Sequence, residues 1–144
     1  MRRSGLTCAA ALALLLASPI AAREIHVDCA REHQSVMIDA DSDRNFIQLM
    51  WSEGVAEEYT QGDGYVSGPD SKGRTEKVTY LVDFGKDSVA FGQDRICTPE
   101  SIAAGCRDKR LRNTLDLSSG LLKYEDQEST IMLKCKEAPP GRRF

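Results

Sequence analysis

Hydrophobic and polar residues alternate with a period of two along much of the chain. The clearest stretch runs from Glu76 to Phe91, where every second position from Val78 to Phe84 is apolar. Because successive side chains of a strand point to opposite faces, this pattern predicts a strand with one buried face. Turn-forming residues interrupt the pattern at 85–87, and it resumes from Val89 to Phe91. Two alternating runs joined in this way predict a β-hairpin.

Shorter segments of the same kind recur on both sides of this hairpin. They are separated by glycine, serine, asparagine and aspartate, which are typical of turns. The pattern predicts an all-β antiparallel meander of about eight short strands that forms a small barrel or a curled sheet. A two-layer sandwich is the alternative. The further strand segments are 25–29, 35–38, 46–51, 55–60, 111–117, 121–125 and 130–135.

One short helix interrupts this series of strands. Thr98 is suited to a helix N-cap, Pro99 to the first helical position and Gly105 to the C-terminal stop. These residues lie between Cys97 and Cys106, so a disulfide between the two cysteines would clip the helix.

The segment Gln61–Arg74 has no sustained alternation and is rich in glycine. Only Tyr65 and Val66 suggest a strand fragment there. Irregular segments of this length in compact domains are either functional or mobile, and the sequence leaves both alternatives open.

The N-terminal residues have the features of a secretory signal peptide. Arg2 and Arg3 precede an apolar run from Leu6 to Leu16, and Ala22 is a small residue at the expected cleavage point. The run is too short to span a bilayer. We therefore expect a signal peptide at 1–22, a single β-rich domain at 23–137 and a disordered tail at 138–144. The expected location is periplasmic or extracellular.

Removing Arg2 and Arg3 leaves 17 basic against 22 acidic residues. This negative balance disfavours nucleic acid as a partner, because phosphate contacts require clustered positive charge.

Four cysteines remain after residue 22, an even number that implies two disulfides in an exported chain. We expect Cys29 to pair with Cys135, because these residues lie in the first and last predicted strands, and Cys97 to pair with Cys106. Neither the cysteines nor the two histidines, His26 and His33, have the spacing of a zinc site.

Other motifs give weak signals for metal binding or catalysis. Asp39, Asp41 and Asp43 have the spacing that begins a calcium loop, but Arg44 stands at the glycine position and Met50 at the closing glutamate position. No G-x-S-x-G motif is present, and the cysteines are assigned to disulfides. We therefore expect no metal, no cofactor and no enzymatic activity. A hydrolase with an unrecognised site is the third-ranked function.

Two function hypotheses remain ahead of catalysis. The first is a binding module for a secreted protein or an envelope component, and the second is a barrel-type carrier of a small apolar ligand. The sequence does not predict an oligomeric state. Residues assigned to the binding hypothesis are Tyr65, Ser67, Arg107, Lys109, Arg110 and Arg112, and those assigned to the ligand cavity are Phe46, Trp51 and Tyr80.

Overall fold

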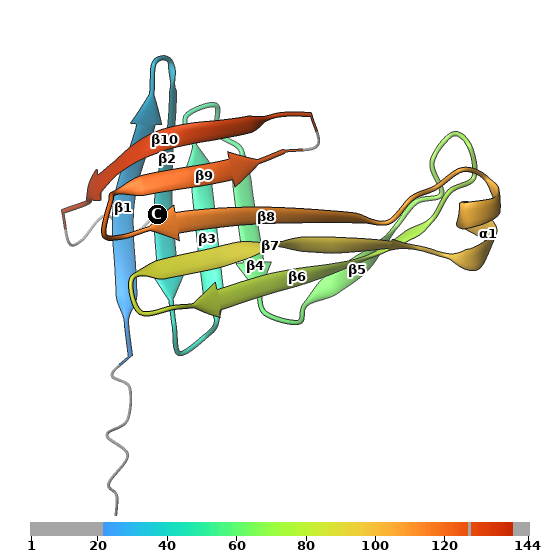
Figure 1. Ribbon diagram of the computed structural model, residues 1–144, viewed down its shortest axis with the longest axis horizontal. Helices are drawn as coiled ribbons and strands as arrows, with labels where there is room; N and C mark the ends of the chain where they lie inside the picture. Colours follow the sequence, from blue (N-terminus) through green and yellow to red (C-terminus); the bar gives the residue numbers. More distant parts are fainter. Residues whose placement is uncertain (1–21, 127, 140–144) are drawn as a thin grey trace, which may run out of the picture.

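The computed structural model describes residues 22–126 and 128–139. It forms one antiparallel sheet of ten strands, curled into a half-barrel, with one helix of five residues (Figure 1). The predicted fold class is confirmed, with ten strands in place of about eight. The strands are β1 (Glu24–Arg31), β2 (Gln34–Asp41), β3 (Phe46–Trp51), β4 (Ala56–Thr60), β5 (Gly64–Ser67), β6 (Glu76–Phe84), β7 (Ser88–Cys97), β8 (Lys109–Asp116), β9 (Leu121–Glu125) and β10 (Thr130–Glu137), and the helix is α1 (Pro99–Ala103).

Two predictions fall mainly outside this range. The signal peptide predicted at 1–22 lies outside the described residues except for its last position, and so do residues 140–144 of the predicted tail. Within the described part of the chain, no helix is long and apolar enough to cross a membrane.

The strand order is β4-β3-β2-β1-β10-β9-β8-β7-β6-β5, so the first and last strands are neighbours in the middle of the sheet. Cys29 and Cys135 are directly opposite each other in the register of β1 and β10, and they form the predicted disulfide. The chain-entropy model gives such a crosslink more effect the longer the loop that it closes. The Cys29–Cys135 disulfide therefore fixes the pairing of the first strand, β1, with the last strand, β10.

The core lies on the concave face of the curled sheet. Figure 1 shows β1–β4 running across the direction of β6–β10. Inward-facing residues of both groups, such as Ile38 and Leu49 on one side and Phe91 and Leu115 on the other, belong to one buried cluster. The alternation in the sequence therefore corresponds to a single buried face, as in other half-buried antiparallel sheets.

The two edge strands, β4 and β5, are consecutive in the chain and are joined by Gln61–Asp63. At this corner the backbone N–H of Tyr80 donates to the carbonyl of Asp63 at 2.7 Å. The N–H of Val82 donates to the side-chain carbonyl of Gln61, also at 2.7 Å. These bonds hold the end of β4 against β6.

One part of the sheet extends beyond the half-barrel. Figure 1 shows β5, the start of β6, the end of β7, α1 and the start of β8 projecting together away from β1–β4. We call residues 64–77 and 95–110 the distal arm. It includes β5, a strand of four residues in the segment where the sequence suggests only a two-residue fragment.

Candidate functional site

The end of the distal arm is held in shape by the predicted disulfide between Cys97 and Cys106. Thr98 is the N-cap of α1 and Pro99 lies in its first turn, as the sequence predicts. Ser101 is buried, and its hydroxyl accepts a hydrogen bond of 2.6 Å from the backbone N–H of Thr75. The helix is therefore fixed to the segment that leads into β6.

A largely buried ion pair supports the same region. The guanidinium of Arg95 lies 2.6 Å from the carboxylate of Glu76, and each side chain is only 16% exposed. Glu76 also lies close to the sulfurs of Cys97 and Cys106. Metal ligation by cysteine requires a thiolate, and these two sulfurs are bonded to each other. The group is therefore structural.

The loop between β5 and β6 is organised around Asp70. Its carboxylate accepts hydrogen bonds from the backbone N–H groups of Lys72 and Arg74, and from the guanidinium of Arg74. The guanidinium contact is the main reason why the pKa of Asp70 is lowered to about 2. The segment that the sequence leaves as either functional or mobile thus has a defined internal structure.

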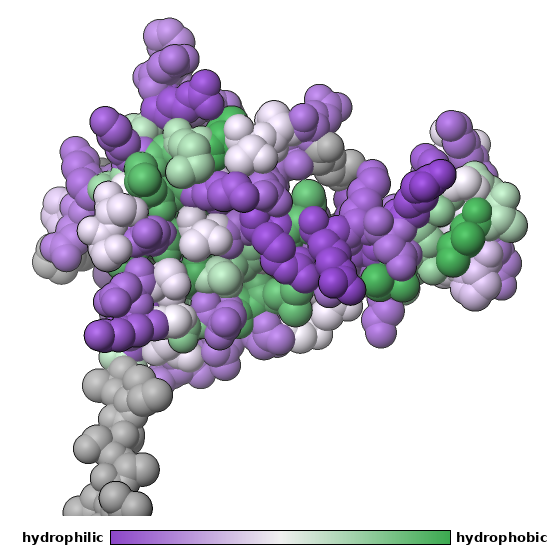
Figure 2. Space-filling model, in the orientation of Figure 1, coloured by the Kyte–Doolittle hydropathy of each residue, from purple (hydrophilic) through white to green (hydrophobic). Residues whose placement is uncertain are grey.

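The distal arm exposes several large apolar side chains. Tyr65 is 49% exposed, Val66 68%, Ile96 43% and Ile102 57%, whereas the rest of the described chain has only Val55 and Met132 in this class. Figure 2 shows apolar surface at the α1 end of the arm with hydrophilic residues beside it. Four of the six large apolar side chains that are exposed in the described residues thus belong to the distal arm.

The register places these side chains on both faces of the distal arm. Val66 and Ile96 are each directly opposite Lys77, so the three share one face of the sheet. Tyr65, the neighbour of Val66 in β5, points to the other face. Ser67 lies at the end of β5 and is half-buried.

The predicted basic cluster separates into two groups. Arg112 is a structural residue, because its guanidinium donates to the carbonyls of Gln93 and Leu111 and lies 2.6 Å from the carboxylate of Asp94. Arg110 is 3.9 Å from the same carboxylate and is 76% exposed.

The remaining members, Arg107 and Lys109, are exposed and have no ion-pair partner in residues 22–126 and 128–139. Lys72 and Lys77 are in the same situation, and sequence reasoning missed both. Lys72 and Lys77 are distant in the sequence from the basic cluster at 107–112. Nothing in the sequence therefore indicates that the fold brings all these cations to the distal arm.

A second polar group lies on the concave face. The carboxylate of Glu57 accepts hydrogen bonds from the indole N–H of Trp51 at 2.9 Å, the hydroxyl of Tyr59 at 2.7 Å and the hydroxyl of Tyr124 at 2.9 Å. Burial raises the pKa of both tyrosines, and the charge of Glu57 acts in the same direction. Sequence reasoning missed Glu57, although its spacing of two from Tyr59 places both on the inward face.

The residues proposed for a ligand cavity do not line a common space. Trp51 is buried, whereas Phe46 lies on the opposite face of β3 beneath the guanidinium of Arg44. Tyr80 packs edge-on against Tyr59. Trp51 and Tyr80 are therefore part of the packed interior, and Phe46 is part of the convex surface.

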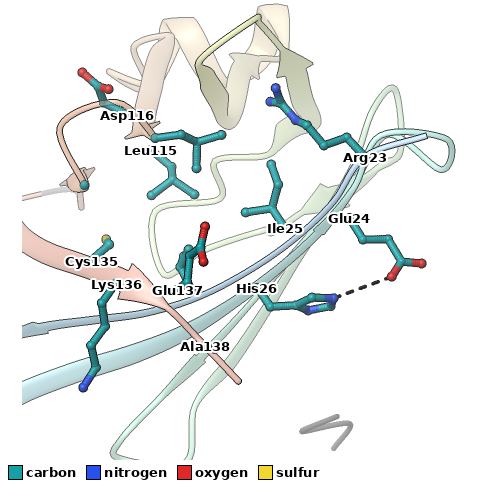
Figure 3. A pocket seen from close by; sticks show the side chains of 13 residues that line it. Arg23, Glu24, Ile25, His26, Leu115, Asp116, Cys135, Lys136, Glu137 and Ala138 are labelled. Atoms are coloured by element: carbon teal, nitrogen blue, oxygen red, sulfur yellow. Dashed lines mark ion pairs between the residues drawn. The ribbon is translucent and has the colours of Figure 1, made fainter. Parts of the chain in front are cut away.

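A different cavity, of about 360 Å³, opens at one end of the half-barrel. Figure 3 shows Ile25 and Leu115 facing it from opposite sides. Arg23 lies at its rim, where its guanidinium donates to the carbonyls of Gly85 and Lys86. The cavity combines an apolar wall with a charged rim.

Two of the aspartates with calcium-loop spacing at 39–43 form hydrogen bonds within the protein. Asp39 is hydrogen-bonded to the ring of His26, and one carboxylate oxygen of Asp41 accepts the backbone N–H groups of Asp43 and Arg44. The second arrangement is that of a turn stabilised by an aspartate side chain.

No protein-family model matches the chain, and no significant match was found among curated proteins or solved structures.

Proposed function

We propose that the protein is an exported binding module that recognises an anionic component of the cell envelope through its distal arm. The observation that carries this proposal is the coincidence, in one projecting part of the molecule, of four exposed apolar side chains with cations that have no ion-pair partner among the described residues. Apolar side chains supply contact energy, and the cations favour an anionic partner.

Stability of the half-barrel does not require this arrangement. Leaving apolar surface in water forgoes about 25 cal/mol per Å² of burial, so the exposed side chains do not contribute this energy in the isolated chain. The disulfide Cys97–Cys106 and the ion pair between Arg95 and Glu76 nevertheless hold the region in a defined shape. A preorganised surface loses less conformational entropy when it binds.

Export is part of the same proposal. Two disulfides are typical of proteins that work in an oxidising compartment. The N-terminal sequence, with its short apolar run before Ala22, has the features of a cleaved leader.

Photo-crosslinking tests the proposal directly. A diazirine amino acid would replace Val66 in the distal arm or, as the matched control, Val55 in the half-barrel, which is exposed to a similar extent. We expect Val66 to give adducts with isolated envelope material and Val55 to give few. Equal yields at the two positions would contradict the proposal.

A carrier of a small apolar ligand is the second candidate function. The cavity of about 360 Å³ between β1 and β8 favours it, because this volume lies within the range of small-molecule sites. Native mass spectrometry of protein purified from its source tests this candidate. A retained small molecule supports the carrier, and it should be lost when Leu115 is replaced by a larger residue such as tryptophan.

A further inference from the structure

We propose that the component recognised by the distal arm is the surface of an anionic phospholipid bilayer, and that the end of the arm enters the headgroup region. This inference rests on the proposed function and specifies its partner. It is carried by two independent features of the distal arm, the distribution of its apolar side chains and its charge.

The exposed apolar side chains of the distal arm are not confined to one face of the sheet. Val66 and Ile96 lie on one face of the sheet and Tyr65 on the other. Ile102 lies on α1, which follows the end of β7, and is also exposed. A protein partner would contact mainly one face, whereas a bilayer contacts an inserted end on all sides. The arrangement therefore favours lipid.

The charge of the distal arm is opposite to that of the rest of the molecule. Residues 64–77 and 95–110 contain seven basic and four acidic residues, a net charge of +3. The remainder of the chain from Arg23 onward contains ten basic and 18 acidic residues, a net charge of −8. An anionic surface would attract the distal arm and repel the half-barrel, so the molecule would approach with the arm first.

Most acidic groups of the distal arm are already engaged. Asp70 pairs with Arg74, Glu76 pairs with Arg95, and Asp108 accepts the backbone N–H of Cys97. Glu100, in the first turn of α1, is the acidic residue left at this end.

The cations that remain for lipid phosphates are Lys72 and Lys77 in the first segment of the arm, and Arg107 and Lys109 in the second. Exposed apolar side chains with flanking lysine and arginine are the combination found in proteins that bind the bilayer interface without spanning it.

Cosedimentation with vesicles tests the inference. Protein beginning at Arg23 would be mixed with phosphatidylglycerol vesicles and, separately, with neutral phosphatidylcholine vesicles. We expect at least about tenfold stronger association with the anionic vesicles at low salt, and we expect high salt to weaken it because the surface charge is screened.

Matched variants test whether the distal arm makes the contact. Ile102→Asp and the double variant Lys77→Glu/Lys109→Glu should each reduce association several-fold. Val55→Asp and Met132→Asp change apolar side chains of the half-barrel that are exposed to a similar extent, and they should leave the association unchanged. Circular dichroism and thermal unfolding of each variant show whether the fold is retained.

Two results would overturn the inference: no preference for the anionic vesicles, or association that the distal-arm variants leave unchanged. If vesicles do not bind but the Val66 probe still crosslinks to an envelope protein, the bilayer inference fails and the proposed function stands. If Val66 and Val55 give equal crosslinks as well, both fail.

Discussion

The hydroxyls of Tyr59 and Tyr124 donate hydrogen bonds to the same carboxylate, that of Glu57, at 2.7 and 2.9 Å. Tyr59 lies in the edge strand β4, and Tyr124 lies in β9, five positions away in the strand order. The carboxylate therefore bridges the two sides of the half-barrel. A half-buried charge of this kind requires several donors, and the indole N–H of Trp51 is the third.

Replacing Glu57 by alanine should lower the free energy of unfolding by about 2 to 4 kcal/mol, because three donors lose their acceptor at once. Glu57→Gln, which keeps an acceptor oxygen, should cost less. The matched control is Glu58→Ala, since Glu58 is exposed and bonded only to Gln48 in the described structure. Urea denaturation measures all three, and an equal effect at the two positions would show that the bridge contributes nothing.

The protein should lose stability above about pH 10, the ordinary pKa of tyrosine. The pKa values of Tyr59 and Tyr124 are raised by burial and by the charge of Glu57, so their neutral forms are favoured in the folded state. This contribution is complete below pH 10. It is lost as the pH rises further, because the unfolded chain ionises first, by up to about 1.4 kcal/mol per pH unit for each tyrosine.

The double variant Tyr59→Phe/Tyr124→Phe should unfold with a shallower dependence on alkaline pH, even though its stability at pH 7 is lower. Denaturation curves between pH 8 and 11 give the slope. If the free energy of unfolding of the variant depends on pH as steeply as that of the parent protein, groups other than Tyr59 and Tyr124 cause the loss of stability at alkaline pH.

The pKa of His26 should lie above its ordinary value of about 6.5, because its ring is hydrogen-bonded to the carboxylate of Asp39. The stability from this pair is present below pH 6.5 and is lost as the pH rises through the raised pKa. Asp39→Asn should lower the pKa measured by NMR. Glu24→Gln should lower it less, since Glu24 is 3.7 Å from the ring and more exposed.

Arg95→Ala should destabilise the protein by about 1 to 3 kcal/mol, because it leaves the carboxylate of Glu76 largely buried without its partner. Arg110→Ala is the control, and it should cost less than about 0.5 kcal/mol because the Arg110 side chain is mostly exposed. Chemical denaturation measures both changes. Equal costs would mean that the ion pair does not support the distal arm.

Several local features of the fold could be predicted from the sequence. The apolar run from Phe46 to Trp51 predicts β3 with its observed bounds, and the order Thr98-Pro99 predicts the start of α1. Both are local signals, because strand alternation and helix capping depend on residues close together in the chain.

The distal arm could not be predicted in the same way. β7 continues to Cys97, beyond the last alternating apolar residue at Phe91, through the polar stretch 93–95. The backbone of this polar stretch is held in a strand because it pairs with β6 on one side and β8 on the other. Such pairing does not require an alternation of apolar and polar residues in β7. The role of Glu57 also depends on curvature, which brings Tyr124 to it from 67 residues away.

The ratio of crosslinking yields from probes at Val66 and Val55, measured with isolated envelope, shows directly whether the distal arm is the part of the protein that binds. The two positions are both exposed, but only Val66 belongs to the distal arm. A distal arm that contacts the envelope predicts adducts at Val66 with few at Val55. A ratio near one, or adducts mainly at Val55, would contradict the account.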